Sequence, residues 1–180
     1  MDKDIEQILL TEEQIQNRIR ELGEELTAEY ADKTPVIGGV LKGVVVFYAD
    51  MVRQIKVHCQ MDFMWISSYA GTDSTGKMLV RQDVTANIEG RHVLILEDIF
   101  DTGNSLEFTV NHLKQKNPAS IKVCTLLDKP ERRREGVTLK ADYVGFTIPN
   151  AFVVGYGLDY NEKYRNLPYV GILKPEVYAK

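Results

Sequence analysis

The stretch VLILEDIFDTGNSL, residues 93–106, joins an apolar run to a cluster of acidic, hydroxyl and glycine residues. Val93 to Leu96 predict a buried strand, and Glu97, Asp98 and Asp101 follow closely. Neighbouring carboxylates repel one another and lose hydration when buried, so a purely structural sequence has little use for them there. We therefore expect these acids to serve a ligand.

The turn DTGNS, residues 101–105, leads into an expected helix over residues 105–116. Backbone N–H groups at a helix start favour anions, the hydroxyls of Thr102 and Ser105 can add hydrogen bonds, and Gly103 allows close approach. Ligands of an open parallel sheet bind beyond the carboxyl ends of its strands. Taken singly, each residue also fits a strand, an acidic turn or a helix cap. Together, carboxylates for a sugar diol and a phosphate-binding turn predict a ribose 5-phosphate site.

Strands alternate with helices on both sides of this stretch. Thr11 to Gln14 read as a capping box, and apolar residues then recur at helical spacing as far as Tyr30. We expect helices over 11–30, 43–55 and 105–116, and strands over 35–41, 57–68, 78–84, 91–98, 121–129 and 141–149. This alternation predicts an α/β fold with a mainly parallel, doubly wound sheet flanked by helices.

Composition and charge narrow the class of protein. The 180 residues suit one domain, and the net charge of −4 gives no global attraction to nucleic acid or to an anionic membrane. Cys59 and Cys124 lie in apolar surroundings outside any CxxC pair, which predicts buried free thiols. The first residues lack the pattern of a signal peptide, and no apolar run suits a membrane span. We expect a cytoplasmic protein.

Two polar stretches are expected to be loops. SYAGTDSTGK, residues 68–77, is rich in Gly, Ser and Thr and is a candidate for a mobile lid. ERRRE, residues 131–135, is interpreted as a solvated loop, with phosphate steering or subunit contact as alternatives.

The central motif resembles that of the type I phosphoribosyltransferases, which share a hydrophobic strand, two acids, two apolar residues and Asp-Thr-Gly-x-Ser/Thr. Further segments are similar to those of the hypoxanthine (hypoxanthine-guanine) phosphoribosyltransferases of this family, and the resemblance covers about residues 5–173. These segments are LKG (41–43), SY (68–69), LLDK (126–129), DYVGFTIP (142–149) and FVVGYGLDYNEKYRNLPYVG (152–171).

The resemblance implies an enzyme of purine salvage. It would transfer the 5-phosphoribosyl group from 5-phosphoribosyl 1-pyrophosphate to N9 of hypoxanthine and guanine, with Mg²⁺ and an oxocarbenium-like transition state. The products would be IMP or GMP and pyrophosphate. The resemblance also implies one domain over residues 1–180, with a core over about 30–150 and a small hood from the N-terminal segment and about 150–180. Relatives are commonly homodimers or homotetramers.

The resemblance also implies roles for individual residues. Glu97 and Asp98 would contact the ribose and magnesium, and Asp101 would be the general base. Lys129 would donate a hydrogen bond to the 6-oxo group of the purine, Phe152 would stack on the ring, and the turn at Lys42 would carry a non-proline cis peptide. The full groups are Asp101, Thr102, Gly103, Asn104 and Ser105 for the 5-phosphate; Lys42, Gly43 and Arg165 for pyrophosphate; Lys129, Phe152, Val153 and Asp159 for the purine; Glu97, Asp98 and Asp159 for metal; and Ser68 and Tyr69 for the mobile loop.

Other functions stay open at this point. Ala151 stands where a lysine near the purine is common in mammalian relatives, so the preference among hypoxanthine, guanine and xanthine is open. A phosphoribosyltransferase for adenine, xanthine or orotate is one alternative, against which Lys129 and the FVVGYGLDYNE segment argue. A nucleotide-sensing regulator that binds RNA is another, and the acidic net charge and the retained Asp101 count against it.

Overall fold

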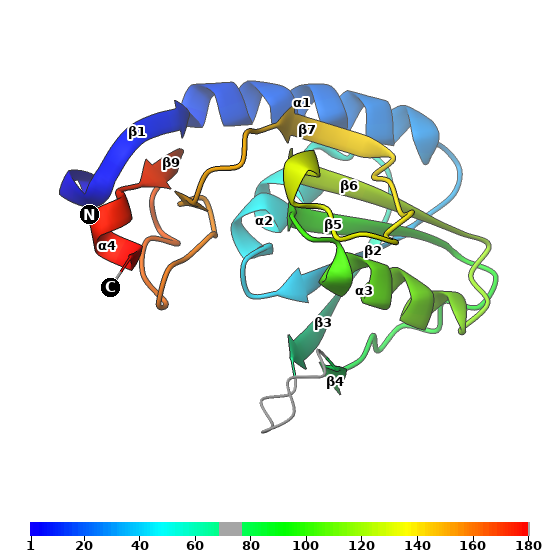
Figure 1. The fold of residues 1–180 in the computed structure, drawn as a ribbon. Helices are drawn as coiled ribbons and strands as arrows, with labels where there is room; N and C mark the ends of the chain where they lie inside the picture. The colour runs from blue at the N-terminus through cyan, green and yellow to red at the C-terminus, as the bar shows by residue number, and fades with distance from the viewer. Residues whose placement is uncertain (69–76, 180) are drawn as a thin grey trace.

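A six-stranded, mainly parallel sheet forms the centre of the computed structural model, which describes residues 1–68 and 77–179 (Figure 1). The strand order is β4-β3-β2-β5-β6-β7, and β4 alone runs antiparallel to its neighbour. The strands are β2 (Val36–Leu41), β3 (Gln60–Ser68), β4 (Met78–Gln82), β5 (His92–Phe100), β6 (Ser120–Asp128) and β7 (Tyr143–Thr147). The predicted α/β fold is confirmed.

Helices cover both faces of this sheet. Leu94 and Leu96 of β5 pack with buried residues of α1 (Glu12–Glu29) and α2 (Val45–Gln54). Val93 and Ile95 pack on the opposite face with residues of α3 (Asn104–Lys114), which lies in front of the sheet in Figure 1. This strict alternation follows from the two-residue period of a strand, and it makes β5 a central strand buried on both sides.

The predicted capping box begins α1. The Thr11 hydroxyl accepts a hydrogen bond from the Gln14 backbone N–H at 3.2 Å, and the Gln14 side chain accepts one from the Thr11 N–H at 2.8 Å. These two bonds satisfy N–H groups that the helix cannot satisfy itself, and they fix where the helix starts.

A second, smaller sheet lies at one end of the molecule, and we call it the hood sheet. It joins β1 (Ile5–Leu10), β9 (Val170–Leu173) and β8 (Val153–Val154) in antiparallel order, with α4 (Pro175–Tyr178) beside it. Figure 1 shows the two ends of the chain close together there. The sequence after residue 150 has no clear hydrophobic period, so β8, β9 and α4 were not predicted.

Two expectations, on the end of β5 and on the burial of Cys59, need correction. Strand β5 continues past Asp98 because Ile99 and Phe100 still pair with Leu127 and Asp128 of β6. Cys59 is half-buried and not buried, because it lies in the connection before β3, whereas Cys124 is buried in β6 and both thiols are free.

The predicted loops are only partly described. Ser68 ends β3 and pairs with Met78 of β4, whereas Tyr69 and the rest of the stretch through residue 76 lie outside the described residues. The charged stretch after β6 contains a single turn of 3₁₀ helix, η2 (Pro130–Arg132). Among the described helices, none is both long and apolar enough to cross a membrane.

Candidate functional site

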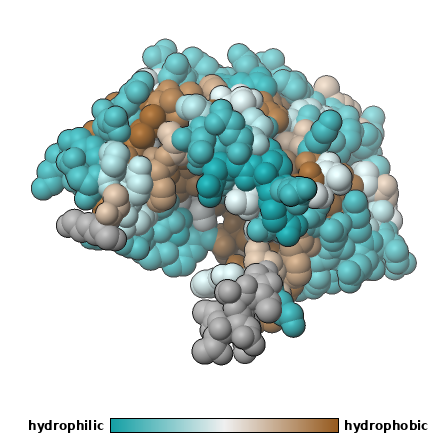
Figure 2. Space-filling view, viewed as in Figure 1, coloured by the Kyte–Doolittle hydropathy of each residue, from teal (hydrophilic) through white to brown (hydrophobic). Residues whose placement is uncertain are grey.

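A cavity of about 680 Å³ lies where β2, β5 and β6 end, beneath the segment that leads into the hood sheet. Figure 2 shows a hollow near the centre of this face, bordered largely by hydrophilic residues. Ten of the predicted site residues line the cavity: Gly43, Glu97, Asp98, Asp101, Ser105, Lys129, Phe152, Val153, Asp159 and Arg165. The predicted residues Ser68, Lys42, Thr102, Gly103 and Asn104 do not line it themselves. Most of the residues predicted from the sequence therefore border one cavity.

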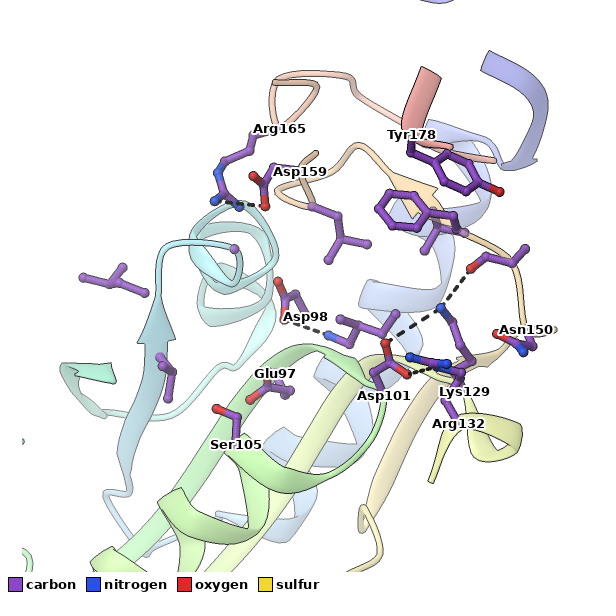
Figure 3. Close-up of a pocket in the computed structure, with 18 of the residues that line it drawn as sticks. Glu97, Asp98, Asp101, Ser105, Lys129, Arg132, Asn150, Asp159, Arg165 and Tyr178 are labelled. Atoms are coloured by element: carbon purple, nitrogen blue, oxygen red, sulfur yellow. Dashed lines mark hydrogen bonds and ion pairs between the residues drawn. The ribbon is translucent and has the colours of Figure 1, made fainter. Parts of the chain in front are cut away.

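Glu97 and Asp98 are adjacent on β5 and so point to opposite faces of the sheet. Figure 3 shows Glu97 beside Ser105, and Asp98 on the side of Arg165. A Cβ added at Gly43 would lie 2.0 Å from Asp98 Oδ2, so only glycine permits this approach. Burial and the neighbouring Asp98 raise the pKa of Glu97, and burial raises the pKa of Asp98. A bound cation would favour the ionised forms.

The turn after β5 leaves backbone donors open. Gly103 has φ +89°, a left-handed conformation that favours glycine, and a Cβ there would lie 2.9 Å from Val137 Cγ1. Helix α3 starts at Asn104 with no side-chain hydrogen bond from its N-cap residue. Within the described part of the chain, the N–H groups of Thr102 and Gly103 have no hydrogen-bond partner. Such a turn suits an anion.

Asp101 lies between two cations at the opposite end of the turn. Its Oδ1 lies 3.4 Å from Arg132 Nε and its Oδ2 lies 4.0 Å from Lys129 Nζ. Lys129 is 6% exposed, and its Nζ donates a hydrogen bond to the Ala151 carbonyl at 2.8 Å. Burial and the charge of Arg132 lower the pKa of Lys129, while Asp101 opposes them. Sequence reasoning missed Arg132, one of three successive arginines.

An aromatic pair closes the cavity on the hood side. Phe152 is 38% exposed and stacks on Tyr178 of α4, with ring centroids 4.7 Å apart and an angle of 18° between the planes (Figure 3). Tyr160 meets Phe152 edge-on at 5.7 Å. Ile99, Leu158 and Asn150 also line the cavity and were not predicted. Tyr178 gave no sequence signal, because its helix is one turn long.

The two cations at the far end of the cavity, Lys42 and Arg165, form ion pairs with acidic residues of the same chain. The Leu41–Lys42 peptide is cis, as the resemblance implies. Lys42 Nζ lies 2.9 Å from Glu162 Oε2, and Arg165 Nη2 lies 3.1 Å from both Glu162 Oε1 and Asp159 Oδ1. Both cations lower the pKa of Glu162. Arg165 Nη1 donates to the Gly157 carbonyl at 2.8 Å, and its buried Nε has no partner within the described residues. Sequence reasoning missed Glu162.

The acidic residues fit a hard divalent cation only in part. Within residues 1–68 and 77–179, no group of three or more His, Cys, Asp or Glu side chains could hold a metal ion. Glu97, Asp98 and Asp159 nevertheless offer carboxylate oxygens around one cavity. Mg²⁺ commonly takes one or two protein carboxylates and completes its shell with water and substrate oxygens. The donor set therefore fits magnesium held largely by a phosphorylated ligand.

Known proteins resemble this chain along its whole length. Residues 7–161 match the family model described as a phosphoribosyl transferase domain. A hypoxanthine-guanine phosphoribosyltransferase of Streptococcus pneumoniae is 51% identical over 180 residues, covering 99% of both chains. A crystal structure of a hypoxanthine phosphoribosyltransferase from Staphylococcus aureus superposes with a TM-score of 0.95 at 49% identity, covering 100% of this chain and 97% of the other.

A longer relative matches equally well. The bifunctional protein TilS/HprT of Listeria innocua is 52% identical over 181 residues, which cover 100% of this chain. The chain spans 28% of the length of that relative.

Proposed function

The chain belongs to the phosphoribosyltransferase family, and we propose that it transfers the 5-phosphoribosyl group of 5-phosphoribosyl 1-pyrophosphate to N9 of hypoxanthine and guanine. The products are IMP or GMP and pyrophosphate, in purine salvage. One observation carries this proposal: Glu97 and Asp98, the two ends of the open turn at Asp101 and Ser105, Lys129 and Arg165 all border one cavity. Each end of the substrate then has a chemically matched part of the site.

The ribose 5-phosphate end lies over β5 and the start of α3. Glu97 and Asp98 hold the ribose hydroxyls, and residues 101–105 bind the 5-phosphate. The unpaired N–H groups of Thr102 and Gly103 and the Ser105 side chain at the cavity wall support this role. Both ends of the sugar are then fixed, so C1 is presented in one orientation.

The purine lies between Lys129 and the aromatic pair. Lys129 Nζ donates one of its three N–H bonds to the Ala151 carbonyl, so two donors remain for the 6-oxo group of the purine. Adenine carries an amino group at that position, which is itself a donor and cannot accept this hydrogen bond. Phe152 stacks on the ring, supported from behind by Tyr178, and the main chain of Val153 reads the base edge. Asp101 lines the same cavity and accepts the proton that leaves the purine imidazole as N9 attacks C1.

Pyrophosphate departs toward Lys42, Gly43 and Arg165. Arg165 Nε, which has no partner among the described residues, supports an anion there once Glu162 no longer pairs with Lys42 and Arg165. Glu97, Asp98 and Asp159 would hold magnesium. Magnesium supplies, when bound, neutralisation of the charge that develops on the leaving pyrophosphate. Ser68 and Tyr69 begin the loop that we assign to covering the site.

We also propose that the chain works as a homodimer or homotetramer in the cytoplasm. Met61 and Trp65 are exposed and lie four residues apart on β3, so they share one face of it. Leu79 is exposed on β4 and pairs with Ser67 on that same face. Exposed apolar residues grouped in this way support self-association, and the two free cysteines suit a reducing compartment. Light scattering on the purified chain measures the assembly.

A spectrophotometric assay tests the activity. With 5-phosphoribosyl 1-pyrophosphate and magnesium, we expect turnover of hypoxanthine and guanine and a far lower kcat/KM for adenine. Xanthine is the fourth base offered. Chelation of the magnesium should stop turnover and serves as the control. Turnover of adenine alone, or of no base while IMP still binds, would contradict the proposed reaction.

A further inference from the structure

We call residues 101–105, which follow β5, the phosphate turn. The carbonyl groups at its start all face one segment of the chain. The Phe100 carbonyl accepts hydrogen bonds from the Lys129 N–H and from Arg133 Nη1, both at 3.0 Å. Arg133 Nη1 also donates to the Asp101 carbonyl at 2.6 Å. The Thr102 carbonyl accepts from the Arg134 N–H at 3.0 Å. Three successive carbonyls are therefore held by residues 129–134.

The direction of these carbonyls decides the direction of the donors. In a trans peptide the C=O of one residue and the N–H of the next point in opposite directions. Because the carbonyls of Phe100, Asp101 and Thr102 face residues 129–134, the N–H groups of Asp101, Thr102 and Gly103 face away from them. The unpaired donors at Thr102 and Gly103 are the ones that the proposed 5-phosphate site needs.

Arg133 is the residue whose side chain contacts these carbonyls. Its Cζ lies 3.3 Å from the centroid of the Phe100 ring, and its Nη2 is hydrogen-bonded to Asp128 Oδ1. The side chain is 18% exposed, unlike that of Arg134, which is 57% exposed and reaches Glu107. The expectation that ERRRE is a solvated loop is therefore wrong for Arg133, whose partners are Phe100 on β5, Asp101 in the turn that follows and Asp128 on β6.

We propose that Arg133 is a positioning residue for ribose 5-phosphate binding, which acts through the carbonyls of Phe100 and Asp101 to aim the donors of the turn at the 5-phosphate. This inference rests on the proposed function, because it assigns the 5-phosphate to residues 101–105. The planar guanidinium can reach two carbonyls, a carboxylate and a ring face together, whereas an ammonium group cannot. Geometry, and not charge alone, is the property that matters.

Titration calorimetry on the full chain tests the proposal with two ligands, ribose 5-phosphate and inorganic pyrophosphate. We expect Arg133→Met to weaken ribose 5-phosphate by about 10- to 100-fold, the usual cost of a misplaced binding group. Pyrophosphate, which is assigned to the far end of the cavity, should change less than about twofold. Arg133→Lys should weaken ribose 5-phosphate nearly as much as Arg133→Met. Arg134→Met is the matched control and should bind both ligands like the unaltered chain.

Several results would overturn the proposal. Arg133→Lys with unaltered affinity would reduce the role to charge, and equal loss of both ligands would reduce it to general stability. Because Arg133→Met leaves Asp128 unpaired, the double variant with Asp128→Asn keeps the test valid if the single variant unfolds. Unaltered ribose 5-phosphate binding in the double variant would refute the role. An unaltered chain that binds ribose 5-phosphate but transfers nothing to any purine would contradict the proposed reaction and leave the role of Arg133 standing; one that does not bind it would overturn both.

Discussion

Replacing Lys129 by methionine separates the purine-recognition role that we propose for this residue from its structural contacts. Methionine keeps a similar length and removes the ammonium, which is buried at 6% exposure and lies in the cavity. A hydrogen bond to a charged group is worth about 1.5–3 kcal/mol. Since 1.36 kcal/mol is tenfold, kcat/KM for hypoxanthine should fall by roughly 10- to 150-fold relative to that for adenine.

The ratio of the two bases is the useful quantity. The substitution also leaves the Ala151 carbonyl without the Lys129 donor and removes one cation near Asp101. Both losses act on either base, so they cancel in the ratio. Arg132→Met is the matched control, because it removes the cation 3.4 Å from Asp101 Oδ1 without touching the donor assigned to the 6-oxo group.

The pH profile gives a second, independent readout. Burial lowers the pKa of Lys129 below its ordinary value of 10.5, and only the protonated form is charged. In the unaltered chain, kcat/KM for hypoxanthine should therefore fall as the pH rises through this lowered pKa. In Lys129→Met this fall of kcat/KM at high pH should be absent. A variant that keeps its preference for hypoxanthine over adenine would refute the reasoning. So would an equal loss of preference in Arg132→Met.

Three further predictions concern other parts of the cavity. Asp101→Asn should lower kcat by about 100-fold or more, as for loss of a general base, while IMP affinity measured by calorimetry changes little; unchanged turnover would remove Asp101 from that role. Glu162→Gln should tighten pyrophosphate binding by about twofold to fivefold at low salt, because Glu162 no longer competes for Lys42 and Arg165, and weaker binding would show that it assists the anion instead. Tyr178→Ala should raise KM for hypoxanthine by about twofold to tenfold through loss of its stack on Phe152, with KM for 5-phosphoribosyl 1-pyrophosphate unchanged; equal rises would point to disruption of the whole hood.

The parts of the site that sequence predicted are those set by short-range patterns. The apolar run along β5 and the glycine at position 103 are local features of the sequence, so the strand and the turn were recognised with their acids. The capping box at Thr11 is equally local. The end of β5 was misjudged, because Ile99 and Phe100 remain in the strand through pairing with β6, about 28 residues away.

The residues that were missed depend on distant partners. The three successive arginines look alike in sequence, yet only Arg133 donates hydrogen bonds to the carbonyls of Phe100 and Asp101 at the end of the adjacent strand. These partners lie more than 30 residues earlier in the chain, so the local sequence does not reveal them. Glu162 pairs with Lys42, which lies 120 residues earlier. Tyr178 meets Phe152 only because the hood sheet brings two irregular segments together. Hydrophobic periodicity along the sequence cannot predict contacts between such distant residues.

The hood sheet also sets an order on synthesis of the chain. Strand β1 pairs with β9, so residues 5–10 must wait until residues 170–173 have left the ribosome. At about 5–20 residues per second, this wait is roughly 10 to 30 s. During that interval the contacts of Arg133 with Phe100, Asp101 and Asp128 can already form, because all of these residues precede β7. A nascent chain can therefore form the turn proposed for the 5-phosphate before the hood sheet, which carries Phe152 and Tyr178, is completed.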